Sequence, residues 1–188
     1  NANDIMARAL NDGVYEAGAS HATLSPSMDI QVASNFERML FDLLDRDGAR
    51  VAQQMAAFAD TGELGLSPAL WREATSIFSG LRLDDAGTLA EIRDTLAATG
   101  EVLDPHSAIA VAGGRAASTD ASVPMIALAT AHPAKFPDAV KQATGRVPEL
   151  PPHMADLYTR KENFAVIRND VEAVKGAIRA RLEQGAEA

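Results

Sequence analysis

The chain has 188 residues, and its 17 lysines and arginines against 26 aspartates and glutamates give a net charge of −9. This excess of negative charge repels phosphodiester backbones and anionic lipids, and no apolar run approaches the roughly 20 residues that span a bilayer, so neither nucleic acid nor a membrane is an expected partner. Cysteine is absent, which excludes disulfides and thiolate metal sites and favours a cytoplasmic location.

The first half of the chain carries the patterns of helices. A helix is expected from Ser34, because Ser34 and Glu37 have the spacing of a capping box and apolar residues follow at helical spacing. A second helix is expected over residues 48–59. Ser67 followed by Pro68 is a typical helix start, with an N-cap hydroxyl and proline at the first helical position.

Helices are also expected in the second half of the chain. One should run from Asp85 to a stop at Gly100, another should follow Asp104, and a short one should begin at Pro137. The last helix is expected at 169–183. The residues expected to face inward from it are Val171, Val174, Ile178 and Leu182.

Two short segments between these helices have the character of strands. Residues 78–85 fit a strand or a connector, and the run VPMIALA at 123–129 is typical of a buried parallel strand. Helices interleaved with such segments indicate an α/β fold.

Three polar residues follow the second of these segments. Thr130 would lie at the carboxyl end of the strand, where open α/β sheets bind ligands, although a threonine there can also bond only to the local backbone. His132 could act as an acid–base group, a ligand or a loop anchor. Lys135 could meet an anion or remain solvated.

Residues 23–38, TLSPSMDIQVASNFER, form the richest polar segment. Free amides at a helix N-terminus, joined by the side chains of Asn35 and Arg38, make a natural anion site. A capping box alone would explain Ser34 and Glu37 but neither Asn35 nor Arg38.

Asp104, His106 and His132 could be drawn as the metal site of a hydrolase. Their spacing lacks the HExxH pattern and any second histidine three or four residues on. Asp104 as a helix N-cap explains the same residues more simply, so no metal is expected.

Several segments, taken in order, resemble threonine synthase, a pyridoxal-phosphate enzyme of the tryptophan-synthase-β-like fold. They are NANDIMARAL, TLSPSMDI, SNFER, LDPHSA and ATAHPAKFPDAV. Each is a weak pattern alone, but their joint order is specific and spans most of the chain. Ser107 stands where this family is expected to carry threonine, and Ala33 where it is expected to carry serine.

The resemblance implies a helix-rich, partial three-layer α/β domain of pyridoxal-phosphate fold type II with a helical insertion. Residues 1–33 would be part of the cofactor domain, 34–79 the helical insertion, and 80–188 the C-terminal part of the cofactor domain. The lysine that forms the Schiff base with the cofactor, and the loop that holds the cofactor phosphate, would both precede residue 1. The chain is therefore interpreted as the C-terminal portion of a threonine synthase, inactive and free of pyridoxal phosphate by itself.

The intact enzyme would convert O-phosphohomoserine and water into threonine and phosphate, with pyridoxal phosphate as electron sink. Its missing N-terminal part would be a partner of this chain, and a homo-oligomer is compatible with the sequence. The resemblance implies that Thr130 faces the pyridine nitrogen of the cofactor. The residues implied to face the substrate phosphate are Ser34, Asn35 and Arg38, and those implied to line the cleft are Ser27, Asp29, His132 and Lys135.

Two other readings remain open at this point. The chain could belong to another enzyme of the same cofactor fold, such as a dehydratase, or it could be a stably folded module without catalytic activity. A metal hydrolase built on Asp104, His106 and His132 is the least favoured alternative.

Overall fold

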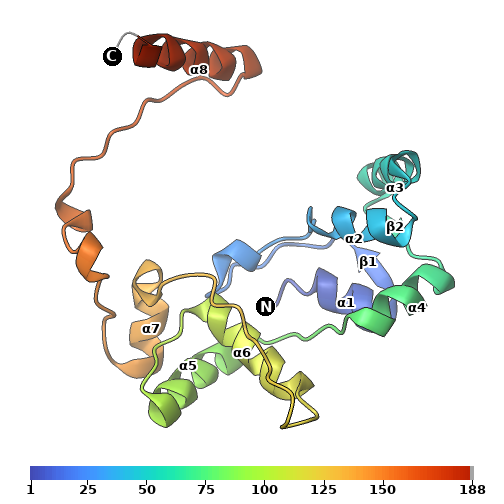
Figure 1. The fold of residues 1–188 in the computed structure, drawn as a ribbon, viewed down its shortest axis with the longest axis horizontal. Helices are drawn as coiled ribbons and strands as arrows, with labels where there is room; N and C mark the ends of the chain where they lie inside the picture. The colour runs from blue at the N-terminus through green and yellow to red at the C-terminus, as the bar shows by residue number, and fades with distance from the viewer. Residues whose placement is uncertain (187–188) are drawn as a thin grey trace. The chain divides into compact units, whose positions relative to one another are not determined.

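The computed structural model describes residues 1–186. The chain divides into two compact units, Asn1–Glu149 and Leu150–Ala188 (Figure 1). The first unit contains seven α-helices and a two-stranded sheet among its described residues. The second contains two short 3₁₀ helices, Pro152–Met154 and Leu157–Thr159, and the helix α8 (Val171–Ala186). The division at 33 and 79 stays a prediction.

The N-terminal part of the first unit surrounds a small antiparallel sheet. Its elements are α1 (Ile5–Asp12), β1 (Val14–Glu16), α2 (Phe36–Leu43), α3 (Gly48–Thr61), β2 (Glu63–Gly65) and α4 (Pro68–Ile77). In the sheet, Tyr15 of β1 lies opposite Leu64 of β2. Both strands are too short to show a period in the sequence, and neither they nor α1 were expected.

Tyr15 is the centre of the core in this region. Its ring stacks on Phe36 with centroids 4.7 Å apart and meets Phe58 edge-on at 5.3 Å. The Tyr15 hydroxyl accepts a 2.9 Å hydrogen bond from the backbone N–H of Ala33, so the ring is buried with its polar end satisfied. The core therefore ties β1 to α2 and α3 through Phe36 and Phe58, which lie 21 and 43 residues after Tyr15 in the chain.

Three helices make up the rest of the first unit: α5 (Asp85–Thr99), α6 (Pro105–Ala117) and α7 (Pro137–Thr144). α5 packs against both α6 and α7, and its Ile92 is fully buried beside Ala108 and Ala143. The expected helix ends are confirmed here. Gly100 ends α5 in the left-handed conformation at φ 82°, and Asp104 caps α6.

The expected parallel strand at 123–129 is wrong for the described residues. This segment belongs to no helix or strand, and the only sheet among residues 1–186 is β1–β2. Its apolar side chains are exposed, Ile126 by 79%. A strand needs a neighbour to accept and donate its ladder hydrogen bonds, and none of the described residues supplies one. Residues 78–84 are likewise a connector.

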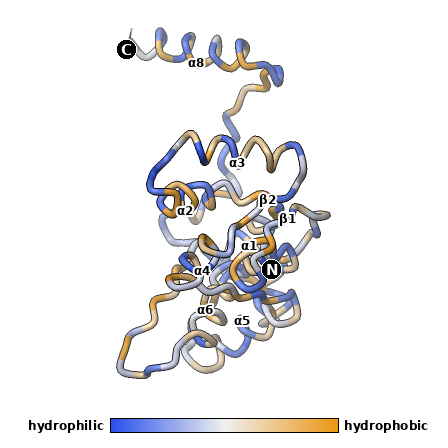
Figure 2. Tube along the Cα trace, turned by 90° about the vertical axis from the view of Figure 1, so that its right-hand side faces the viewer, coloured by the Kyte–Doolittle hydropathy of each residue, from blue (hydrophilic) through white to orange (hydrophobic). Residues whose placement is uncertain are grey.

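The expected inward face of α8 is also wrong. Val171, Val174, Ile178 and Leu182 have helical spacing but are exposed. Figure 2 shows hydrophobic and hydrophilic residues alternating along this helix. Helical periodicity identifies an apolar face, but burial depends on what packs against it.

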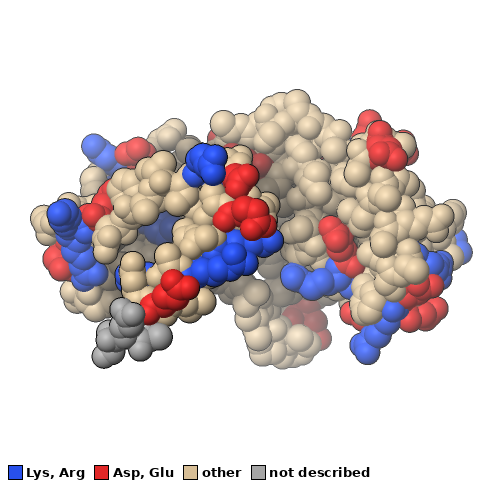
Figure 3. Space-filling view, turned by 90° about the horizontal axis from the view of Figure 1, so that it is seen from above, with Lys and Arg blue, Asp and Glu red and all other residues tan. Residues whose placement is uncertain are grey.

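None of the helices within the described residues is long and apolar enough to cross a membrane. Lysines and arginines lie interspersed with aspartates and glutamates on the face shown in Figure 3. That face offers no extended basic surface of the kind that binds nucleic acid.

Candidate functional site

Asp29 organises the polar segment that precedes α2. Its carboxylate accepts hydrogen bonds from Asn1 Nδ2 at 2.8 Å, Asn3 Nδ2 at 3.0 Å, and both the backbone N–H and hydroxyl of Thr23 at 2.9 and 2.6 Å. Asn1 Nδ2 also donates to Ser25 Oγ at 2.8 Å. These four hydrogen bonds satisfy the carboxylate, so Asp29 stabilises the conformation of this loop.

The start of α2 differs from the expected capping box. The helix begins at Phe36, with Asn35 at the N-cap and no side-chain cap hydrogen bond. Phe36 N–H donates to the carbonyl of Ala33, so a turn through residues 34 and 35 leads into the helix and carries Ser34 outside it. Sequence spacing cannot detect such a turn, because it depends on where Ala33 is anchored by Tyr15.

This arrangement leaves three predicted substrate-binding side chains free. Ser34, Asn35 and Arg38 are exposed, and none of their side chains forms a hydrogen bond or ion pair with another described residue. They stand at the N-terminal turn of α2, where the backbone N–H groups of Phe36 and Arg38 already donate to the carbonyls of Ala33 and Asn35. The turn can therefore offer an anion two polar side chains and a guanidinium.

Two of the predicted residues line one pocket. Ser27 and Asn35 border a pocket of about 300 Å³ together with Asn1, Asn3 and Arg82. Arg38 is not among the residues that line it. Sequence reasoning missed Asn1, Asn3 and Arg82 as residues of the site. For Arg82 the reason is that it lies in a segment whose pattern indicated only a strand or a connector.

Arg82 reaches this pocket as part of an ion-pair group on Asp4. Arg82 Nη1 lies 3.0 Å from Asp4 Oδ2, and Arg8 Nε lies 3.0 Å from Asp4 Oδ1. Burial acts to raise the pKa of Asp4, but the hydrogen bond from Arg8 and the charges of Arg82 and Arg8 outweigh it and lower that pKa below its usual value. The group of two guanidiniums and one carboxylate carries a net positive charge, but only Asp4 and Arg82 of the three residues line the pocket.

Asp104, His106 and Ser107 form a buried cluster at the N-terminus of α6. Asp104 Oδ1 accepts from His106 N at 2.9 Å and meets His106 Nδ1 at 2.8 Å, while Oδ2 accepts from Ser107 N at 3.2 Å and from the Ser107 hydroxyl. The N-cap reading of Asp104 is confirmed.

The cluster reaches two predicted site segments. His106 Nε2 accepts a 3.2 Å hydrogen bond from Ser27 N–H, and Ser107 Oγ accepts one of 3.2 Å from Thr130 N–H. Thr130 itself is exposed, and its hydroxyl has no hydrogen-bond partner among the described residues. The backbone of Thr130 is thus held while its side chain is free to meet a ligand.

His132 immediately precedes the 3₁₀ helix Pro133–Lys135, and Lys135 is the last residue of that helix. His132 caps this turn, its Nδ1 accepting from Ala134 N–H at 3.1 Å. Lys135 is exposed, with Nζ 5.8 Å from the centroid of Phe136, and it lines a separate pocket of about 270 Å³ with Thr23 and Asp138. The hydrogen bond from Ala134 N–H to His132 Nδ1 shows that His132 stabilises the local backbone turn.

Within residues 1–186, no group of three or more His, Asp or Glu side chains could hold a metal ion. Asp104 and His106 are together, but both nitrogens of the imidazole ring are engaged by the protein. His132 uses its Nδ1 elsewhere.

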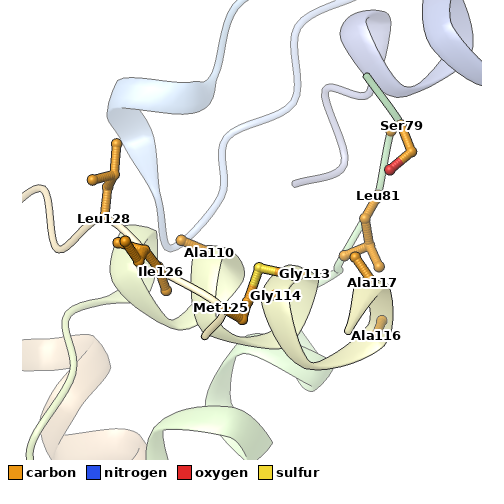
Figure 4. Close-up of a pocket in the computed structure, with 12 residues that line it drawn as sticks. Ser79, Leu81, Ala110, Gly113, Gly114, Ala116, Ala117, Met125, Ile126 and Leu128 are labelled. Atoms are coloured by element: carbon orange, nitrogen blue, oxygen red, sulfur yellow. The ribbon is translucent and has the colours of Figure 1, made fainter. Parts of the chain in front are cut away.

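A larger pocket, of about 540 Å³, is apolar and contains none of the predicted site residues (Figure 4). It lies between the connector at 79–81, the last turns of α6 and residues 125–128. Figure 4 shows Met125 beside Gly114, and a Cβ on Gly114 would come within 3.1 Å of Met125 Cγ. The missing side chain at Gly114 lets residues 125–128 approach α6 closely.

Comparison with known proteins gives one consistent family. A sequence profile described as threonine synthase, C-terminal, matches residues 107–178. The chain is 42% identical over 186 residues to threonine synthase from Pseudomonas aeruginosa and 33% identical to that from Saccharomyces cerevisiae, with 98% and 97% of this chain covered.

Solved structures give the same result. The structure of pyridoxal-phosphate-bound threonine synthase from Brucella melitensis superposes with a TM-score of 0.85 at 44% identity and covers 96% of this chain. Yeast threonine synthase superposes with a TM-score of 0.81 at 33% identity and covers 98%. These matches confirm the expected partial α/β fold.

The chain spans about 40% of the length of the relatives that it matches: 40% of the Pseudomonas and yeast proteins and 39% of the Brucella structure. Sequence and fold nevertheless agree over nearly all of this chain. The chain therefore corresponds to a portion of the threonine synthases that contains their C-terminal domain.

Proposed function

We propose that this chain works as the C-terminal portion of a threonine synthase, a lyase that converts O-phosphohomoserine and water into threonine and phosphate. The observation that carries the proposal is the agreement of sequence and fold with the Brucella enzyme, 44% identity and a TM-score of 0.85 over 96% of the chain. A cytoplasmic location is part of the same proposal, since a chain without cysteine suits a reducing compartment.

Pyridoxal phosphate would be the cofactor of the intact protein, as it is bound in the Brucella structure. When bound, it supplies an electron sink for the charge that develops as substrate carbons lose protons. Thr130 fits a place beside its pyridine nitrogen, because the hydroxyl has no partner in the protein while the backbone is held by Ser107. A neutral hydroxyl can donate to or accept from that nitrogen, unlike a carboxylate, which would hold it protonated.

Substrate phosphate would bind at the first turn of α2. The free side chains of Ser34, Asn35 and Arg38 provide hydrogen bonds and one positive charge at this turn. Arg38 can bind two phosphate oxygens at once through its planar guanidinium. This turn would hold the phosphate both before and after it leaves the substrate.

The remaining predicted residues would act mainly by shaping the cleft. Asp29 holds the loop that carries Ser27, and His132 caps the turn that follows Thr130. Lys135 is exposed at the edge of a separate pocket, so its proposed contact is with solvent-borne anions at the rim. None of the four lysines is proposed to bind the cofactor covalently.

The test is an assay of the intact protein that carries this chain, loaded with pyridoxal phosphate and given O-phosphohomoserine. Threonine and phosphate should appear in equal amounts. The same protein given threonine or serine should release little 2-oxo acid, which separates a synthase from a dehydratase of the same fold. Release of 2-oxo acid without threonine from phosphohomoserine would overturn the proposal.

A further inference from the structure

We propose that Asp104 is a positioning residue that holds the backbone of Thr130 and the backbone of Ser27 in a fixed relation, acting through Ser107 and His106. The inference rests on the proposed function, which assigns Thr130 to the cofactor and Ser27 to the lining of the cleft. It adds a residue that touches neither ligand and that fixes the geometry between them.

Helix capping does not by itself require this cluster. Asp47 caps α3 and Asp84 caps α5. Both residues are exposed, and their carboxylates accept hydrogen bonds from backbone amides alone. Asp104 caps α6 in the same way, but it is fully buried and also accepts from the side chains of His106 and Ser107. Burying a carboxylate is costly unless its lone pairs accept hydrogen bonds. A helix cap does not need to be buried, so the burial of Asp104 and its two side-chain contacts indicate a role beyond the cap.

The Ser107 arm has a fixed direction of donation. Thr130 N–H can only donate, so Ser107 Oγ accepts from it at 3.2 Å. The single hydroxyl hydrogen of Ser107 is then left for Asp104, which can only accept when ionised. Asp104 therefore sets the rotation of the Ser107 hydroxyl and presents its lone pair to Thr130.

The His106 arm has a fixed tautomer for the same reason. Ser27 N–H donates to Nε2 at 3.2 Å, so Nε2 carries no hydrogen and Nδ1 carries the one that is donated to Asp104. The ring also packs on Phe136, with centroids 4.6 Å apart. The imidazole is thus held between the carboxylate and the loop that contains Ser27.

Together the two arms join segments that are far apart in the chain. Ser27 is 79 residues from His106, and Thr130 is 23 residues from Ser107. One carboxylate holds both arms, so a change at Asp104 or Ser107 should alter the position of Thr130 relative to the pocket lined by Ser27 and Asn35. Displacements near 1 Å at a reacting centre can lower turnover about a hundred-fold.

The experiment compares three variants of the intact protein with wild type: Ser107→Ala, Ser107→Thr and, as a control, Asp47→Asn. Amide hydrogen exchange is measured on the protein without cofactor, and steady-state kinetics with O-phosphohomoserine on the loaded protein. Ser107→Ala should speed exchange at Thr130 about ten-fold or more and lower kcat about ten-fold, with KM changed less than about three-fold. Ser107→Thr keeps the hydroxyl and should restore both, whereas Asp47→Asn should leave both at wild-type values.

The two readouts separate the possible failures. Unchanged hydrogen exchange at Thr130 in Ser107→Ala would overturn the claim that Ser107 holds the backbone of Thr130. Faster exchange with wild-type kcat, or no rescue by Ser107→Thr, would reduce the cluster to a structural cap and overturn the positioning role. A wild-type protein without threonine synthase activity would instead overturn the proposed function, and the exchange data would still decide whether Ser107 holds the backbone of Thr130.

Discussion

At the scale of single residues, the site is defined by which polar groups are used and which are left free. Asp29, Asp104 and His132 have their acceptor atoms engaged by the protein. Asn35, Arg38 and the Thr130 hydroxyl are free among the described residues. The sequence marked all of these residues as polar candidates for the site, but only their contacts separate those that shape the cleft from those that can meet a ligand.

Among the side chains without a hydrogen-bond partner, Arg38 gives the sharpest test of phosphate binding. Arg38→Ala in the intact protein should raise KM for O-phosphohomoserine about ten- to a hundred-fold, because a charge-assisted bond to phosphate contributes about 1.5–3 kcal/mol. Glu37→Ala at the neighbouring position is the matched control. Wild-type kinetics for Arg38→Ala would contradict a role in phosphate binding.

Thr130→Val should have a different kinetic signature. Valine keeps the shape and the backbone N–H that Ser107 accepts, so the fold should be retained. Loss of the hydroxyl should lower kcat about ten-fold or more, since the hydroxyl acts on the cofactor, whose electronic state governs the chemical steps. The absorbance of the bound cofactor should shift as well. A variant with normal kcat and an unchanged spectrum would refute contact between Thr130 and the cofactor.

Asp4 gives a prediction for the dependence of stability on pH. Its pKa is lowered in the folded protein by Arg8 and Arg82, against the opposing effect of burial, so its ion pairs stabilise the fold above the unfolded pKa near 3.9. That contribution is lost as pH falls through the lower folded pKa. Asp4→Asn should therefore reduce the free energy of unfolding by about 1 kcal/mol at pH 7, with the difference vanishing once the pH falls below the lowered pKa of folded Asp4.

Urea denaturation at several pH values would measure this. The control is Asp42→Asn, which removes an ion pair to Arg46 that is exposed at both ends and should change little. A difference that grows as the pH is lowered would contradict the assignment to Asp4.

At the scale of elements, close approach between backbones positions the connector that carries Arg82. A Cβ on Gly80 would lie 2.8 Å from Ala7 Cα and 3.0 Å from its carbonyl oxygen, both atoms of the α1 backbone. Asn11 Nδ2 also donates to the Gly80 carbonyl at 3.2 Å. The absence of a side chain at Gly80 thus brings residues 80–82 onto α1, where Arg82 reaches Asp4.

Gly80→Ala should push this connector away from α1. We expect a loss of about 1–3 kcal/mol in the free energy of unfolding, because neither contacting atom can move without shifting the helix. Gly65→Ala is the control, since nothing lies within 4 Å of a Cβ there. Equal denaturation midpoints for the two variants would show that α1 and the connector are not in close contact.

At the scale of the whole molecule, the chain covers about 40% of its relatives' length and exposes apolar segments at 123–128 and on α8. Its four lysines, Lys135, Lys141, Lys161 and Lys175, are all exposed. A lysine that binds a cofactor covalently must sit in a site that orients the cofactor, and Lys175 instead pairs with Glu172 at 2.8 Å.

The 188-residue chain should therefore form no specific covalent complex with pyridoxal phosphate. After mixing at equal concentrations and reduction with borohydride, the intact mass should remain that of the unmodified chain, apart from low, evenly spread labelling. Poly-lysine at a matched lysine concentration sets the level of non-specific reaction. Stoichiometric labelling of a single lysine would refute the assignment of that role to a residue outside this chain.

The sequence by itself determined the local starts and stops: the caps at Ser67 and Asp104, the left-handed glycine at Gly100, and the family through the order of its motifs. The caps and the glycine stop depend on residues within a few positions of one another, and the family on the order of short segments along the chain. The tertiary structure alone decided that α2 begins after Ser34, that residues 123–128 lie exposed, and that one buried carboxylate joins Thr130 to Ser27. Each of these depends on contacts between segments tens of residues apart, which no local spacing or periodicity can encode.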